Sequence, residues 1–130
     1  MQKNLKVIAA GITATAAMSI LIAISPLLGL PRLAVWEKIA SVLKTNIAVG
    51  WLIHFGIGIA FAFIYAWLAR NWRIFNGISG GLLFGFNIFL GVQLMTILFL
   101  GGSNLLLALG SLIGHLAFGG LLGLMLRKAT

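Results

Sequence analysis

Four long apolar stretches, separated by short polar connections, dominate the pattern of the chain. They cover residues 5–28, 47–68, 74–100 and 105–126. A hydrocarbon core of about 30 Å is crossed by roughly 20 helical residues, so each stretch can span a bilayer once and none can span it twice. No stretch alternates apolar and polar residues as a barrel strand would, and a backbone in lipid must satisfy its own hydrogen bonds. We therefore predict four transmembrane helices, of which the longest, 74–100, tilts or protrudes.

The first connection is too long for a simple turn, and its own pattern is helical. Pro31 suits the start of a helix. Apolar residues then recur at three- and four-residue spacing, at Leu33, Trp36, Ala40, Leu43 and Ile47. This predicts a short amphipathic helix over about 32–45 in the interface plane, with Trp36 as its anchor at headgroup depth. Such a helix would cap the mouth of the bundle, or act as a lid or docking helix.

The last connection, residues 101–104 (GGSN), reads as a tight turn. It predicts that the third and fourth spans are antiparallel neighbours.

Composition indicates that lipid is the solvent of these helices. Apolar residue types make up 62% of the 130 residues and charged types 8%. A soluble domain is about half apolar and a quarter charged, and a small one cannot hide so much apolar surface. The expected fold is a single all-α domain over residues 1–130, an integral membrane four-helix bundle with one interfacial helix.

Nine Lys and Arg residues against one acidic residue give a formal net charge of +8. These charges lie at the ends of segments, which favours the membrane surface over nucleic acid as their partner. Six lie on the side of both termini and three on the opposite side. The six are Lys3, Lys6, Arg70, Arg73, Arg127 and Lys128, and the three are Arg32, Lys38 and Lys44. The positive-inside rule then places both termini in the cytoplasm and the protein in the cell's inner membrane.

Glycine is unusually frequent, with 17 residues, and several glycines recur at helical spacing. Small residues let apolar helices approach closely in lipid, where van der Waals contact replaces the hydrophobic effect. We expect helix packing, within the chain or between chains, at Gly77, Gly81, Gly85, Gly110, Gly114, Gly119 and Gly123.

The two halves of the chain resemble each other. Residues 11–14 (GITA) are similar to residues 77–80 (GISG), and a histidine followed by small residues at four-residue steps occurs at 54–62 and again at 115–123. A duplication would give two tandem helical hairpins related by an axis along the membrane normal.

His54 and His115 carry the only candidate chemistry inside the spans. At the helical rise they lie about 12 and 15 Å into their helices, near mid-membrane, where an ionisable side chain points to a functional site. Gly58 and Gly119 follow one turn later and could leave room for a macrocycle, so a b-type haem with two histidine ligands is one interpretation. A proton, ion or small-solute path is another.

The same histidines could simply be structural, each hydrogen-bonded to a neighbouring polar group. Ser111 lies one turn before His115. Other hydroxyl and amide groups on the spans are Thr13, Thr15, Ser19, Asn87, Gln93 and Thr96.

Signatures of an enzyme are absent from the sequence. It has no cysteine, no phosphate-binding glycine loop, no paired carboxylates and no metalloprotease motif, and Glu37 is its only acid. The leading hypothesis is a non-catalytic subunit or packing module that associates with itself or with a larger membrane complex. The haem-binding electron carrier and the small transporter or channel are the alternatives.

Three short motifs carry a resemblance to a known group of proteins. They are residues 29–31 (GLP), 50–55 (GWLIHF) and 110–116 (GSLIGHL). In these motifs the chain resembles a family of small four-helix bacterial inner-membrane proteins grouped only as a domain of unknown function. The resemblance covers nearly the whole chain. It implies four helices and a bacterial membrane, and it implies no activity.

Overall fold

The computed structural model describes residues 1–127, so Lys128 lies outside the described part of the chain. Every regular element in that part is helical. In chain order they are α1 (Gln2–Ile24), a 3-10 turn (Ser25–Leu28), α2 (Val35–Val42), α3 (Ile47–Asn71), a 3-10 turn (Arg73–Phe75), α4 (Gly77–Leu100) and α5 (Leu105–Leu126). The helices α1, α3, α4 and α5 are long and apolar enough to cross a membrane. The predicted all-α, four-span membrane fold is confirmed.

Several predicted boundaries differ from those of the structure; α3, for example, ends at Asn71 instead of at residue 68. The third span begins at Gly77 rather than at residue 74, because Arg73–Phe75 forms a separate 3-10 turn. The first span ends as an α-helix at Ile24, and Gly29, with φ 79°, then redirects the chain. The amphipathic helix covers only Val35–Val42 instead of 32–45, and Lys44 adopts a left-handed conformation (φ 52°) shortly after its end.

Side-chain caps define the starts of α3 and α5. The Asn46 side chain accepts a hydrogen bond from the Val49 amide (3.0 Å), and the Asn104 side chain accepts one from the Leu107 amide (2.9 Å). An asparagine at this position satisfies an amide that the helix itself cannot pair. The two spans that carry the histidines therefore begin at residues that the sequence specifies locally.

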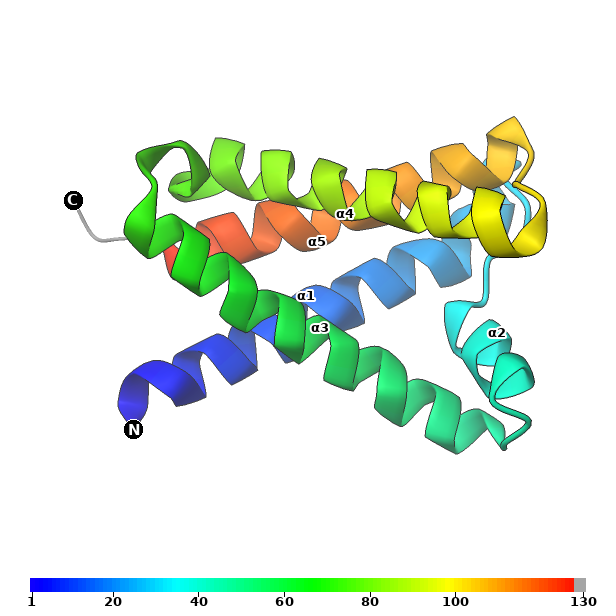
Figure 1. Ribbon diagram of the computed structural model, residues 1–130, viewed down its shortest axis with the longest axis horizontal. Coiled ribbons are helices and arrows are strands. Elements are labelled where there is room, and N and C mark those ends of the chain that lie inside the picture. The colour runs from blue at the N-terminus through cyan, green and yellow to red at the C-terminus, as the bar shows by residue number, and fades with distance from the viewer. Residues whose placement is uncertain (128–130) are drawn as a thin grey trace.

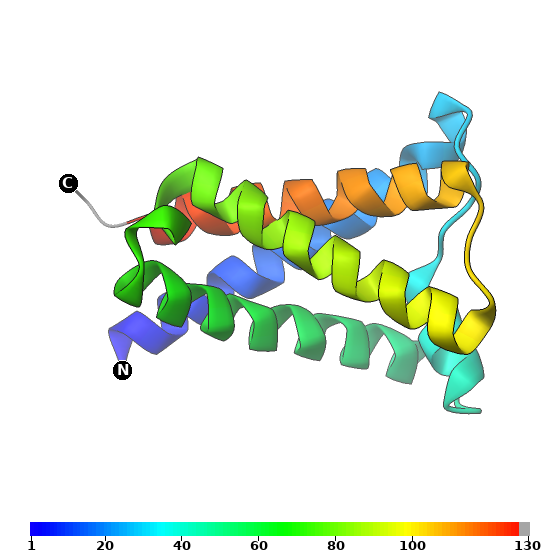
Figure 2. The same cartoon turned by 45° about the horizontal axis from the view of Figure 1, so that its top comes forward.

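The four long helices form two hairpins (Figure 1). α1 crosses α3, while α4 and α5 run antiparallel in close contact, as the tight turn between them predicts. The start of α1 and the end of α5 lie at the same end of the bundle, and α2 lies at the other (Figures 1 and 2). We call these the terminal end and the α2 end.

At the terminal end, α3 packs against the start of α4. Tyr65 of α3 is fully buried, and its hydroxyl donates to the carbonyls of Phe75 (2.7 Å) and Gly77 (3.2 Å). Phe75 lies just before α4, and Gly77 is the first residue of α4. Its ring packs against that of Phe84, with centroids 5.2 Å apart. These contacts hold α3 beside the start of α4.

The two hairpins use equivalent contacts, which supports the proposed pair of tandem hairpins. A Cβ added at Gly11 would lie 3.3 Å from the carbonyl oxygen of Gly58, and one at Gly81 would overlap the carbonyl oxygen of Gly119. Gly58 and Gly119 therefore correspond, as the sequence comparison suggests. The sequence comparison pairs Gly11 with Gly77. In the structure Gly11 corresponds instead to Gly81, which lies one helical turn after Gly77. Because glycine recurs every four residues in α4, sequence comparison cannot distinguish these two registers.

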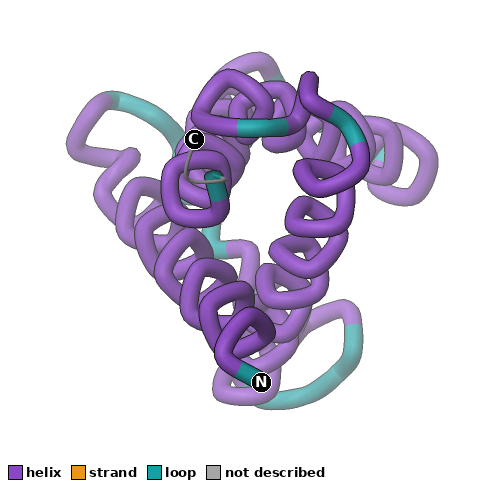
Figure 3. The backbone as a smooth tube through the Cα atoms, turned by 90° about the vertical axis from the view of Figure 1, so that its left-hand side faces the viewer, coloured by secondary structure: helices purple, strands orange, loops and turns teal. Residues whose placement is uncertain are grey.

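The correspondence between the hairpins breaks where one hairpin meets the other. α1 packs along α5, where a Cβ added at Gly114 would lie 3.3 Å from the side chains of Met18 and Ile22. The equivalent pair, α4 and α3, touch at only a few positions. α3 carries Ile53 where α5 carries Gly114, and an isoleucine does not allow so close an approach. Seen along the bundle, the long helices are arranged around a common centre (Figure 3).

Candidate functional site

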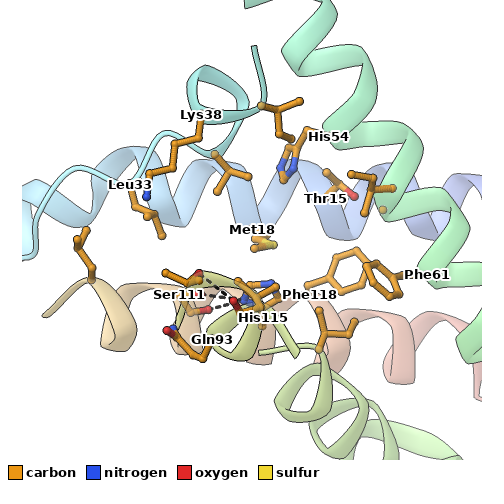
Figure 4. Close-up of a pocket in the computed structure, with 18 of the residues that line it drawn as sticks. Thr15, Met18, Leu33, Lys38, His54, Phe61, Gln93, Ser111, His115 and Phe118 are labelled. Atoms are coloured by element: carbon orange, nitrogen blue, oxygen red, sulfur yellow. Dashed lines mark hydrogen bonds between the residues drawn. The ribbon is translucent and has the colours of Figure 1, made fainter. Parts of the chain in front are cut away.

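A cavity of about 320 Å³ lies between α3 and the α4–α5 hairpin (Figure 4). Side chains from all four long helices line it, and residues of α2 and of the loop before it line its α2 end. Most of the lining is apolar. The cavity therefore lies where α3 and α4 lack the close contact that the equivalent pair, α1 and α5, makes.

His54 reaches the cavity from α3 and is 7% exposed. Its Nε2 lies 3.1 Å from the hydroxyl oxygen of Ser19 on α1. That hydroxyl already donates its one proton to the carbonyl of Thr15 (2.8 Å), so it can only accept from the histidine. The neutral ring is therefore assigned its proton on Nε2, and Nδ1 is left with a free lone pair.

His115 reaches the same cavity from α5 and is 9% exposed. Its Nδ1 lies 2.7 Å from the backbone carbonyl of Ser111, which can only accept, so the neutral ring carries its proton on Nδ1. The Ser111 hydroxyl lies 3.3 Å from the same nitrogen. Nε2 is then the nitrogen with the free lone pair.

Two of the candidate partners of the histidines are thus used, Ser111 on the same helix and Ser19 on α1. The hydrogen bonds do not use all of each ring. His54 Nδ1 and His115 Nε2 bond to no group in the described chain, and neither atom is completely buried. Two hydrogen-bond acceptors consequently line one apolar cavity from different helices.

The cavity is divided along its length. Figure 4 shows Lys38, Gln93 and Ser111 toward the α2 end, with the two histidines near the middle. Phe61 and Phe118 lie toward the terminal end. Gln93 accepts a hydrogen bond from Ser103 (3.0 Å), which leaves its amide NH₂ group as a donor. The arrangement provides polar groups at one end and an apolar chamber at the other.

Comparison with known families covers the entire chain. Residues 1–130 match the group described as "Family of unknown function (DUF6789)". The chain belongs to this family. The membership agrees with the resemblance seen in the short motifs, and it assigns no activity. No curated protein and no solved structure matches the chain.

The two glycines expected to accommodate a haem are both held in helix contacts. A Cβ added at Gly58 would overlap the Thr15 hydroxyl of α1, and one at Gly119 would overlap the carbonyl of Gly81 on α4. Gly58 lines the cavity, whereas Gly119 does not. The two glycines therefore serve helix contacts and do not form a matched slot beside His54 and His115. Within residues 1–127, no group of three His, Cys, Asp or Glu side chains could hold a metal ion.

The predicted packing glycines divide into three groups. Gly81, Gly85, Gly119 and Gly123 lie where α4 and α5 touch backbone to backbone, and Gly77 contributes its carbonyl to the same contact. Gly110 would have no atom within 4 Å of an added Cβ. Gly114 faces α1, as described above. The structure thus places most of these glycines inside the chain's own fold.

Trp36, the predicted interfacial anchor, packs on α3. It is 8% exposed, and its ring stacks on that of Trp51 with centroids 3.9 Å apart and an angle of 12° between the planes. A Cβ added at Gly50 would overlap the Trp36 carbonyl, so α2 lies directly on the first turn of α3. The depth of Trp36 in a bilayer stays a prediction. This docking places Lys38, which is exposed, at the edge of the cavity, a position that sequence reasoning did not predict because it counted Lys38 only among the charges at the membrane surface.

Proposed function

We propose that this protein is a non-catalytic, multi-pass membrane protein that binds an amphiphilic small molecule in the cavity between α3 and the α4–α5 hairpin. The observation that carries the proposal is the cavity itself, about 320 Å³, mostly apolar and lined by two histidine nitrogens with free lone pairs. Ligand sites typically have about 300–1,000 Å³, apolar walls and a few convergent polar groups, and they often lie between the helices of bundles.

The chain itself does not fully enclose the cavity. The cavity continues along α4 into a second hollow, with which it shares Ile88 and Val92, so apolar side chains of its wall are left without protein neighbours. Apolar walls that the chain leaves uncovered are a feature of ligand sites, and they support an occupant here.

The chemistry of the chain supports a role in binding and not in catalysis. Its only acidic side chain, Glu37, is paired with Arg32 on the polar side of α2. Neither residue lines the cavity. The cavity thus contains potential hydrogen-bonding groups and lacks a carboxylate that could act as a partner base for either histidine.

The test is to identify what the purified protein carries. We would purify wild type, Val92→Phe and Leu98→Phe, extract them with organic solvent and quantify the extracted molecules by mass spectrometry. Val92 lines the cavity, so its replacement should displace the ligand, whereas Leu98 is 63% exposed and serves as the matched control. We expect an amphiphile near one per chain in wild type and Leu98→Phe, and a several-fold loss in Val92→Phe. A wild type that carries none, even after incubation with dodecanol, would refute the proposal.

The sequence also predicts a partner, either a second copy or a larger membrane complex, and we retain this as a second element of the proposal. The glycines between α4 and α5 are occupied within the chain, so an association surface would use other positions. Gly91 and Gly110 are candidates, because neither would have an atom within 4 Å of an added Cβ. Replacing each with leucine should reduce chemical cross-linking between chains in native membranes. Unchanged monomeric behaviour of wild type in membranes would count against it.

We further propose a bacterial inner membrane with the terminal end in the cytoplasm, on the support of the charge distribution. Within the described chain, Lys3, Lys6, Arg70, Arg73 and Arg127 lie at the terminal end. The α2 end would then face away from the cytoplasm. Reporter fusions at each terminus test the orientation, and activity of a periplasm-specific reporter at either terminus would contradict it.

A further inference from the structure

Lys38 is an exposed cation at the rim of an apolar cavity, and residues 1–127 offer it no anionic partner. It lines the α2 end of the cavity, and Figure 4 shows its side chain reaching from α2 toward that space. Glu37, the only acidic side chain, forms its ion pair with Arg32 instead. No hydrogen bond or ion pair joins Lys38 to another group among residues 1–127.

Resting on the function proposed above, we propose that the cavity binds an amphiphile with an acidic head group, held between Lys38 and the two histidines, with its hydrocarbon chain toward Phe61 and Phe118. The positions of the polar and apolar groups in Figure 4 match the two parts of such a molecule.

An acidic head group matches the hydrogen-bonding groups better than other head groups do. The O–H of a carboxylic acid or phosphate monoester can donate to the free lone pair of His54 Nδ1 or His115 Nε2, and another of its oxygens can accept from the Lys38 ammonium. An alcohol can donate to a histidine and also accept from the ammonium, but its neutral oxygen makes a weaker hydrogen bond with Lys38 than an ionised oxygen does. A cationic head group would be repelled by Lys38.

The size of the cavity limits how much of the molecule is enclosed. A cavity of about 150 Å³ holds one benzene, so 320 Å³ holds about a dozen non-hydrogen atoms. A second hollow, of about 690 Å³, lies along α4 and shares Phe61, Ile88, Val92, Thr96 and Leu100 with the cavity. A longer hydrocarbon chain can therefore continue from the cavity between α3 and α4 toward the surrounding lipid.

The experiment is a competition between two molecules that differ only in the head group. Protein in digitonin, which has no linear alkyl chain, is mixed with equimolar dodecanoate and dodecanol, desalted and extracted, and each bound species is quantified by mass spectrometry. A charge-assisted contact should enrich dodecanoate over dodecanol by about tenfold in wild type. Lys38→Gln should reduce the ratio to about one while total binding persists. Lys44→Gln, which removes a cation outside the cavity, is the matched control and should keep the wild-type ratio.

The outcomes separate this inference from the proposed function. Equal binding of dodecanoate and dodecanol by wild type, unaffected by Lys38→Gln, would overturn the acidic head group and leave the cavity as a ligand site. Binding of neither molecule would overturn the proposed function itself. Lys38→Glu should exclude dodecanoate and favour dodecylamine, and a Lys38→Glu protein that still prefers dodecanoate would refute the inference.

The source of the acid is a separate arm of the same experiment. Displacement of dodecanoate by phosphatidylglycerol, but not by phosphatidylcholine, would support a membrane phospholipid as the occupant. Retention of dodecanoate against both lipids would support a free fatty acid. Displacement by both lipids equally would contradict selection of an acidic head group.

Discussion

Replacing Gly119 with alanine should force α4 away from α5. The added Cβ would lie 2.7 Å from the amide nitrogen of Gly85 and 2.8 Å from its Cα, and it would overlap the carbonyl oxygen of Gly81. All three are backbone atoms, so no side-chain rotation can relieve the overlap. Ordinary contact begins at 3.4 Å, so the Gly85 amide nitrogen must move away by about 0.7 Å and the Gly81 carbonyl oxygen by more.

Overpacking of this kind destabilises a protein by typically about 1–3 kcal/mol. The higher helix propensity of alanine offsets up to about 1 kcal/mol. We expect a net loss of about 1–2 kcal/mol and a fall in apparent Tm of roughly 3–10 °C for a chain of this length. The assay is loss of the monodisperse peak after heating in dodecyl maltoside, followed by size-exclusion chromatography with fluorescence detection.

Gly110→Ala on the same helix is the matched control. A Cβ added there meets no atom within 4 Å, so only the gain in helix propensity applies and Tm should stay the same or rise. If Gly119→Ala proved as stable as Gly110→Ala, the backbones of α4 and α5 could not be in contact at this position, and the reasoning would be refuted.

Three further predictions concern the other contacts that define the cavity. Tyr65→Phe removes hydrogen bonds to two backbone carbonyls at the terminal end and should lower stability by about 1 kcal/mol in the same assay, since the acceptors lose a buried donor. An unchanged Tm would show that these bonds do not hold α3 to α4. Gly58→Ala should destabilise by clashing with Thr15, and adding Thr15→Ala should recover part of the loss; simple additivity of the two changes would contradict that contact. Trp51→Ala removes the ring that stacks on Trp36, so α2 should detach, and tryptic cleavage at Lys38 in α2 and at Lys44 just after it should accelerate several-fold. An unchanged digestion rate would mean that the stacking does not hold α2 in place.

Much of the architecture follows from local patterns. The number of spans and the start of α5 come directly from apolar length and from an asparagine cap, because the backbone of each span must satisfy its hydrogen bonds within its own helix. The antiparallel pairing of α4 and α5 follows from the tight turn between them. Ser111 as a partner of His115 could also be predicted, because residues four apart lie on the same helix face.

The cavity depends on how the hairpins pack against each other, which no local pattern specifies. Small residues mark packed faces on several of the helices, and the sequence alone does not show which of these faces meet, so it does not reveal that α1 lies along α5 while α3 touches α4 at only a few positions. The four-residue recurrence of glycine left the register between the halves ambiguous by one turn. Only the docked position of α2 shows that Lys38 lines the cavity, because the stacking of Trp36 on Trp51 determines which way that helix faces. Van der Waals contacts between distant segments decided the site, whereas length and hydropathy were enough to predict the spans.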